Sequence, residues 1–306
     1  MSSAVATASD PGTVITGRET VLRAVDAWGT VITLEAAPGD GVDANSLLDV
    51  AEPVLDACEA EVARIDRVFS TYREDSVVTV LRRDPGLEAR LEWSGDGRDV
   101  HTVLVECRAA RSMTGDLFDP WSLDDGFDPS GYVKGWGAGR LANLLMTDLA
   151  GLGACGVCVN AGGDVSVRGT QADGTPWPIG IRDPDDAGAI LRVITATEGH
   201  IATSGLYERG AHVVDPRDGS RPKAGDGRLT ARQATVWGPD DGVADAFATA
   251  LLLGGRDAAS AFEELRASDE EPDRPSRWGA YVVEDGRARR LGETDSLVGP
   301  SLAVMG

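Results

Sequence analysis

The sequence predicts an α+β protein in which helices and short strands are mixed rather than strictly alternating. Two long stretches, at 44–69 and 100–113, carry apolar residues at helical spacing and predict amphipathic helices. Short runs rich in Val, Ile and Thr, separated by Gly- and Pro-rich turns, occupy much of 160–240 and predict a sheet of short strands. The length of 306 residues allows a large domain with its own core.

The first half of the chain predicts strands followed by three helices. Residues 1–19 are polar without periodicity, so we expect a loose arm there and a single domain over 20–306. The expected elements are then strands within 21–35, a helix over 44–69 that Pro53 can kink, a short helix over 76–81, and a helix over 100–113.

The second half predicts a helix among strands, followed by a last helix and strand. Residues 128–133 are expected as strand or loop and 135–149 as a helix. The expected later elements are strands at 156–160, 165–168, 177–181, 190–196, 200–203, 212–214 and 231–236, a helix over 242–253, a surface loop over 267–277 and a strand at 280–283.

The composition excludes some partners. The net charge of −21 disfavours nucleic acid, which needs clustered Lys and Arg, and it repels other polyanions at long range. A phosphate site must therefore be local, made from backbone amides, a few basic side chains or a divalent cation. No apolar run approaches the roughly 20 residues of a membrane helix, and the start lacks the features of a signal peptide, so we expect a cytoplasmic protein without membrane insertion.

A carboxylate and a hydroxyl stand four residues apart on the predicted helix over 242–253. This spacing places Asp245 and Thr249 on one helical face among small and apolar neighbours. A buried carboxylate needs a partner, and Mg²⁺ suits a site with few protein oxygens and the remaining positions filled by water and phosphate. The alternative is structural: Asp245 helps to cap the helix, and Thr249 bonds to a carbonyl of the preceding turn.

Other candidates for chemistry are a histidine and two glycine-rich turns. His212 can accept a proton from a hydroxyl near neutral pH, although a lone strand histidine is more often structural. The segment 128–135 places Lys134 and Gly135 at the start of a predicted helix, where backbone amides and an ammonium can meet a phosphate. The turn 160–164 is the second glycine-rich segment, and either turn can also be a simple connection.

Eight segments in a fixed order resemble the ApbE family, the FAD:protein FMN transferases. Together with the N-terminal strands they span roughly residues 20–285, nearly the whole chain. The matching segments are 69–72 with Ser76, 114–120, 128–135, 159–164, 179–184, 202–207, 212–216 and 244–249.

The resemblance implies a two-lobed α+β fold with FAD in a cleft between the lobes. It implies Mg²⁺ bound by Asp245, Thr249 and the backbone oxygen of Val133, and it implicates His212 in catalysis. It places Trp28, Asp128 and Lys134 among the FAD contacts. We expect the backbone amides near Gly135, Gly162 and Gly163 to hold further phosphate oxygens of the cofactor.

The implied reaction is Mg²⁺-dependent transfer of FMN from FAD to a threonine or serine hydroxyl of an acceptor protein. The acceptor is expected to carry a short threonine-containing motif. Trp28 and Arg82 depart from the family pattern, which has methionine and asparagine there. Two other functions remain open from the sequence: an FAD pyrophosphatase that uses water in the same site, and a non-catalytic flavin-binding protein.

Overall fold

We describe a computed structural model of the chain. It describes residues 12–123, 126–186, 188–205, 213–222, 229, 231–272, 274–284, 287–292 and 302–305. The helices are α1 (Ala44–Phe69), α2 (Val77–Arg83), η1 (Pro85–Arg90), α3 (Gly95–Met113), α4 (Ser130–Leu149), η2 (Ala150–Leu152) and α5 (Asp241–Asp269).

Two antiparallel sheets complete the described fold. The larger runs in the order β1-β2-β3-β4-β5-β8-β9-β10-β11, and the smaller runs β12-β7-β6. The strands are β1 (Thr13–Ile15), β2 (Val21–Ala27), β3 (Thr30–Pro38), β4 (Ala154–Ala161), β5 (Asp164–Gly169), β6 (Trp177–Arg182), β7 (Ile190–Ala196), β8 (Glu198–Gly205), β9 (Gln233–Gly238), β10 (Gly279–Glu284), β11 (Arg287–Leu291) and β12 (Leu302–Met305).

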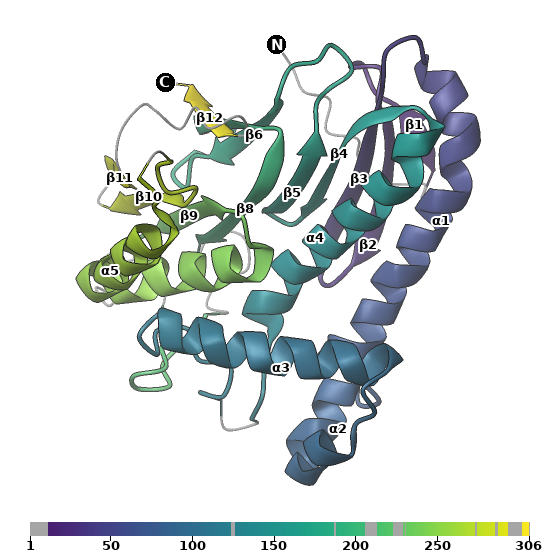
Figure 1. Cartoon of the computed structure of the whole chain (residues 1–306). Coiled ribbons are helices and arrows are strands. Elements are labelled where there is room, and N and C mark those ends of the chain that lie inside the picture. Colours follow the sequence, from purple (N-terminus) through teal and green to yellow (C-terminus); the bar gives the residue numbers. More distant parts are fainter. Residues whose placement is uncertain are drawn as a thin grey trace.

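The large sheet lies between helices and the small sheet. Figure 1 shows α1, α4 and α5 against the large sheet, with α2 and α3 beyond its lower end. Apolar side chains of β2, β3 and β4 pack with α1 and α4, and those of β8, β9 and β10 pack with α5. On the opposite face, Val165, Val167 and Ile201 pack with Trp177 and Ile194 of the small sheet. Because successive side chains of a strand point to opposite faces, the large sheet contributes to two cores, one against the helices and one against the small sheet.

Most of the predicted elements are confirmed, with some wrong boundaries. The helices over 44–69, 76–81 and 100–113 are present, and α1 continues through Pro53. The expected strand or loop at 128–133 is wrong from Ser130 onward, because α4 begins there. The loose arm is wrong for Thr13–Ile15, which pairs with β2. No strand forms at Val213 and Val214, and His212 lies outside the described residues.

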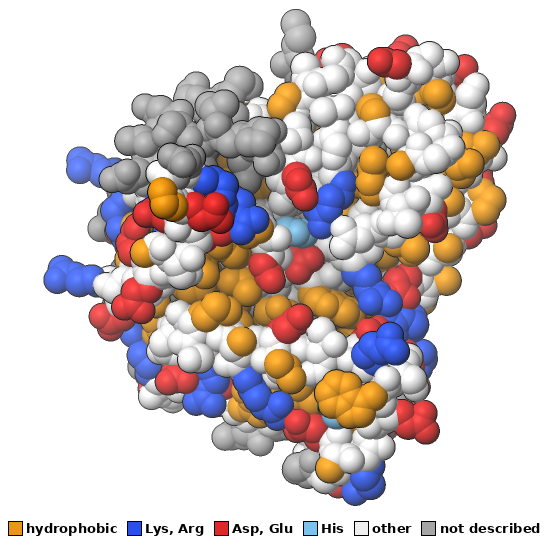
Figure 2. All heavy atoms as spheres, in the orientation of Figure 1, with side chains coloured by type: hydrophobic (Ala, Val, Ile, Leu, Met, Phe, Trp, Pro, Cys, Tyr) orange, Lys and Arg blue, Asp and Glu red, His pale blue; other side chains and the backbone are white. Residues whose placement is uncertain are grey.

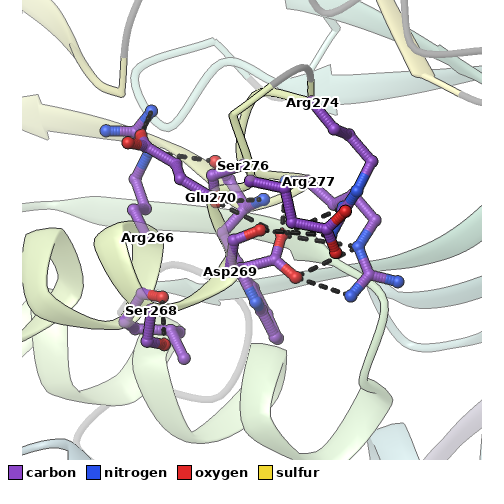
Figure 3. A network of polar contacts seen from close by, with 10 residues as sticks. Arg266, Ser268, Asp269, Glu270, Arg274, Ser276 and Arg277 are labelled. Carbon is purple, nitrogen blue, oxygen red and sulfur yellow. Dashed lines mark hydrogen bonds and ion pairs between the residues drawn. The ribbon is translucent and has the colours of Figure 1, made fainter.

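The last helix is longer than its pattern predicts. α5 continues past the expected end at 253 to Asp269, with one non-helical residue, Gly255 (φ 52°, ψ −116°). Its C-terminal end is held by the network in Figure 3. There Asp269 accepts hydrogen bonds from the backbone N–H and the guanidinium of Arg277, and Arg266 Nε donates to the carbonyl oxygen of Trp278 (3.1 Å). These contacts fix α5 against the start of β10.

Helices α4 and α5 meet closely along a seam of glycines. A Cβ atom on Gly135 would lie 2.5 Å from the backbone oxygen of Asp241, closer than real Cβ atoms come, and 3.3 Å from Cβ of Asp245. A Cβ on Gly131 would lie 3.8 Å from Oγ1 of Thr249. Because glycine has no side chain, the two helices approach until the polar side chains of α5 lie directly on the backbone of α4.

Gly135→Ala tests this seam. Alanine is the better helix former, so helix propensity alone predicts a more stable protein. We expect the opposite, a loss of about 1–3 kcal/mol in the free energy of unfolding, because the new methyl group overlaps the backbone of α5. Urea denaturation measures this change. Gly151→Ala is the matched control, since no heavy atom lies within 4 Å of its added Cβ; equal stabilisation of both variants would contradict the close approach.

Candidate active site

A cavity of about 700 Å³ opens beside the α4–α5 seam. Ligand pockets of proteins usually measure about 300–1,000 Å³, so this one suits a large organic ligand. Its walls come from the end of α1 and the loop after it, the 117–128 loop, the start of α4, the end of β8 and the middle of α5. Seven of the predicted site residues line it: Trp28, Asp128, Val133, Lys134, Gly162, Asp245 and Thr249.

Helix α5 and strand β8 together contribute side-chain oxygens to the cavity lining. Asp245 is 3% exposed and reaches the cavity from one turn of α5, and Thr249 reaches it from the next turn. Ser204 of β8 also lines the cavity, and its Oγ lies 3.2 Å from Oγ1 of Thr249. One buried carboxylate and two hydroxyls therefore face the same space.

This donor set fits a magnesium ion. Hard cations such as Mg²⁺ take oxygen ligands and keep several waters or substrate oxygens, so they need few protein groups. The described residues contain no group of three or more His, Cys, Asp or Glu side chains suited to a metal. Val133 lines the cavity as well, but it lies within α4, where a carbonyl already accepts a helical hydrogen bond. Its oxygen would bind a cation through the second lone pair.

Lys134 is held at the cavity wall by an ion pair. Its Nζ lies 2.6 Å from Oδ2 of Asp164, whose side chain is only 2% exposed. Asp164 begins β5, and its side chain faces α4 because strand residues alternate between the two faces of the sheet. The sequence analysis did not select Asp164; the polar alternation of Asp164, Ser166 and Arg168 along a buried strand is the signal that would have found it.

Trp28 contributes an aromatic ring to the cavity lining. It occupies the β2–β3 turn with φ 54°, followed by Gly29 with φ 70°. A left-handed conformation costs a residue other than glycine roughly 1–2 kcal/mol, so surrounding contacts must hold it. Trp28 Nε1 donates to the carbonyl oxygen of Val62 (3.2 Å). A Cβ atom built on Gly137 would lie 2.6 Å from the indole ring, so the ring packs directly on the backbone of α4. The indole is therefore fixed between α1 and α4.

Asp128 is oriented by its neighbours. Its Oδ1 accepts the backbone N–H of Ser130 (3.0 Å) at the start of α4, and its Oδ2 lies 3.4 Å from Nη2 of Arg82. Arg82 Nε also donates to the carbonyl oxygen of Phe127 (2.7 Å). Arg82 of α2, one of the departures from the family pattern, thus holds in place the loop that carries Asp128.

Two of the predicted cofactor-binding residues do not line the cavity. Gly135 faces α5 within the seam and does not line the cavity. Gly163 does not line it either, and its backbone N–H donates to Oδ1 of Asn160 (2.9 Å) within the turn. The catalytic candidate His212 lies outside the described residues, while Val213 and Val214, which follow it, line the cavity.

Asp241 and His200 are two further buried polar side chains of this region, and neither lines the cavity. Burial, with the charge of Asp240 beside it, raises the pKa of Asp241 to about 7. Burial, with the charge of Arg168, lowers the pKa of His200 to about 3. His200 is therefore neutral near neutral pH, and Asp241 stays protonated to a higher pH than an exposed aspartate.

Asp241→Asn tests this environment through the pH dependence of stability. A carboxyl whose pKa rises from 3.8 to about 7 on folding stabilises the fold fully below pH 3.8, and this contribution is lost as the pH rises through 7. Asparagine has a similar shape and does not ionise. We expect the free energy of unfolding of the variant, relative to wild type, to rise between pH 4 and pH 8 in urea titrations. Asp257→Asn, exposed on the same helix, is the control; parallel profiles of Asp241→Asn and wild type would contradict the raised pKa.

Comparison with known proteins identifies relatives of the chain. Residues 122–270 match the ApbE family. The chain is 32% identical over 146 residues to FAD:protein FMN transferase of Vibrio cholerae and 33% identical over 141 residues to that of Salmonella typhimurium. These matches cover 45% and 43% of this chain but only 41% and 38% of the relatives, so the chain matches about two fifths of their length.

Solved structures share the fold over nearly the whole chain. The flavin transferase ApbE from Vibrio cholerae superposes with a TM-score of 0.68 and 19% identity, covering 90% of this chain and 97% of that one. An ApbE protein from Thermotoga maritima gives a TM-score of 0.68 with 20% identity, covering 89% and 96%. The predicted α+β, ApbE-like fold is confirmed, and the chain is a homologue of the ApbE family, whose curated relatives are named FAD:protein FMN transferase.

Proposed function

We propose that the chain transfers the FMN half of FAD to a hydroxyl group of an acceptor protein, with Mg²⁺ as cofactor. The observation that carries the proposal is the cavity of about 700 Å³, which is lined both by Asp245 and Thr249 and by aromatic side chains. The named activity of the relatives supports it. Across the described ranges, none of the helices combines the length and hydrophobicity needed to cross a membrane.

The lining of the cavity matches the two chemistries of FAD. Trp28, Phe69 and Phe118 offer ring surfaces to a flat aromatic group such as a flavin or an adenine. Lys134 and the side-chain oxygens of Asp245 and Thr249 suit a diphosphate. A protein of net charge −21 needs such local groups to bind a polyanion.

Asp245 and Thr249 would hold Mg²⁺, with the main-chain oxygen of Val133 as a third protein ligand. The bound ion would neutralise charge that grows on the diphosphate oxygens during transfer. Lys134, oriented by Asp164, would contact the same oxygens, and the amide of Gly162, in a turn with φ 65°, would add a donor.

In the proposed transfer, the acceptor hydroxyl oxygen attacks the phosphorus atom that carries FMN. The bond from this phosphorus to the bridging oxygen breaks, and AMP leaves with that oxygen. The hydroxyl proton passes to a base, for which we propose His212, and FMN remains joined to the acceptor through a phosphoester. Water in place of the hydroxyl would give free FMN and AMP, the reaction of a pyrophosphatase.

The decisive experiment combines the protein with FAD, Mg²⁺ and a threonine-bearing acceptor peptide. Mass spectrometry of the peptide should show an added FMN, and AMP should appear in equal amount. Release of free FMN with an unmodified peptide would favour the pyrophosphatase, and unchanged FAD bound by the protein would favour a flavin carrier.

Asp245→Asn tests the metal site. The amide keeps the size of the side chain but removes its negative charge, so we expect a loss of transfer of about a hundredfold or more, with the fold intact by circular dichroism. Asp257→Asn removes an exposed carboxylate from the same helix and should leave transfer unchanged. Full activity of Asp245→Asn at low Mg²⁺ would place the metal elsewhere.

His212→Ala tests the proposed base. Acid–base catalysis contributes about a hundredfold to ten-thousandfold, so transfer should fall by about that factor while the Kd for FAD changes little. His101→Gln is the matched control, because His101 belongs to α3 and does not line the cavity. Turnover of His212→Ala at the rate of wild type would assign the base to another residue.

A further inference from the structure

A cluster of polar side chains ties the beginning of α5 to three other elements. Figure 2 shows acidic, basic and histidine side chains together at the surface between α4 and this end of α5. The cluster comprises Asp241 of α5, His200 of β8, Ser166 and Arg168 of β5, and Asn143 of α4. None of these residues lines the cavity, so the proposed transfer leaves the cluster without a role.

The contacts of the cluster run from α5 across the sheet to α4. Oδ2 of Asp241 lies 3.8 Å from Nδ1 of His200, and the same nitrogen lies 3.0 Å from Oγ of Ser166. Nη2 of Arg168 lies 3.4 Å from Nε2 of His200, and its Nε donates to Oδ1 of Asn143 (3.0 Å). Displacing α5 along α4 would therefore disturb the contact of Asp241 with His200, whose ring also contacts Ser166 and Arg168.

The carboxyl group of Asp241 occupies the space that a side chain at position 139 would fill. A Cβ atom built on Gly139 would stand 1.5 Å from Oδ2 of Asp241. Gly139, Gly135 and Gly131 follow one another at four-residue spacing on α4, opposite Asp241, Asp245 and Thr249, which share that spacing on α5. The contact of Asp241 with Gly139 lies at one end of the seam. Asp245 and Thr249, the metal ligands proposed above, follow along the same seam.

We propose that Asp241 is a positioning residue: seated on Gly139, it sets the register of α5 on α4 and thereby places Asp245 and Thr249 at the cavity. The inference rests on the proposed function for the role of those two ligands. Asp241 itself touches neither the cavity nor the space for the ligand. The proposed effect depends on the shape of the side chain, since its carboxyl group occupies the space beside Gly139.

Four variants test the register. Asp241→Ala removes the carboxyl, and Gly139→Ala displaces it, because the new methyl group needs the same space. Asp241→Asn keeps the shape. The double variant Gly139→Asp with Asp241→Ala returns a carboxyl to this space from the opposite helix. The readout is the Mg²⁺ concentration that half-saturates FAD binding, followed by flavin fluorescence.

We expect Asp241→Ala and Gly139→Ala each to raise the half-saturating Mg²⁺ concentration about tenfold, as partners that orient metal ligands usually do. Their combination should be no worse than either alone, because both remove one contact. Asp241→Asn should stay within about threefold of wild type, and the double variant with Gly139→Asp should recover most of the loss. Unchanged Mg²⁺ dependence in Asp241→Ala would overturn the proposal.

A second measurement separates this inference from the proposed function. Urea unfolding of wild type, Asp241→Ala, Gly139→Ala and their combination needs neither FAD nor Mg²⁺. Non-additive changes support the contact of Asp241 with position 139, and additive changes overturn it. If wild type shows no Mg²⁺-dependent FAD binding, the proposed function fails, and this unfolding cycle still decides whether Asp241 sets the register.

Discussion

The architecture of the site depends on the absence of side chains on one face of α4. Helices usually pack with their axes 8–10 Å apart, at a distance set by the side chains between them. Here the glycines of α4 let its backbone meet α5 so closely that a single methyl group at Gly135 would overlap the carbonyl of Asp241. The polar side chains of α5 therefore lie over the backbone of α4, where other helix pairs have apolar side chains in contact. The cavity opens beside this seam.

This arrangement resolves a conflict between the charge of the protein and that of its proposed ligand. An overall charge of −21 disfavours a dinucleotide at a distance. Within the cavity, Lys134 is fixed by the buried Asp164, and a cation held by Asp245 would add positive charge where the diphosphate lies. The attraction would thus come from local groups of the cavity, while Trp28 and its aromatic neighbours provide an apolar surface that is independent of charge.

Local patterns in the sequence predicted the elements with a clear period, and they predicted which face of α5 lines the cavity. The helix over 44–69 has nine buried residues at helical spacing, and the spacing of Asp245 and Thr249 placed both at one cavity. The Gly254-Gly255 pair resembles a helix end, yet α5 continues, because Leu117 packs against Gly254 and the helix resumes after one non-helical residue. Strands β1 and β11 were missed because they are short edge strands with few buried side chains.

The parts of the site that were not predicted depend on contacts between distant segments. Gly135 and Gly163 were assigned to a ligand because glycine-rich turns often bind phosphate, but one serves helix packing and the other donates its N–H to Asn160. Ser204 joins the site through its contact with Thr249 of α5, and no local period reports such a pair. Asp241 is one helical turn from Asp245, yet the role proposed for it depends on its contact with Gly139, about a hundred positions earlier in the sequence.

The most direct test of the account is a crystal structure of the protein with FAD and Mn²⁺, in which anomalous scattering locates the metal. The account predicts an anomalous peak within about 2.3 Å of a carboxylate oxygen of Asp245, beside Oγ1 of Thr249, with the diphosphate of FAD on its other side. A peak outside the cavity, or FAD bound away from the α4–α5 seam, would contradict it.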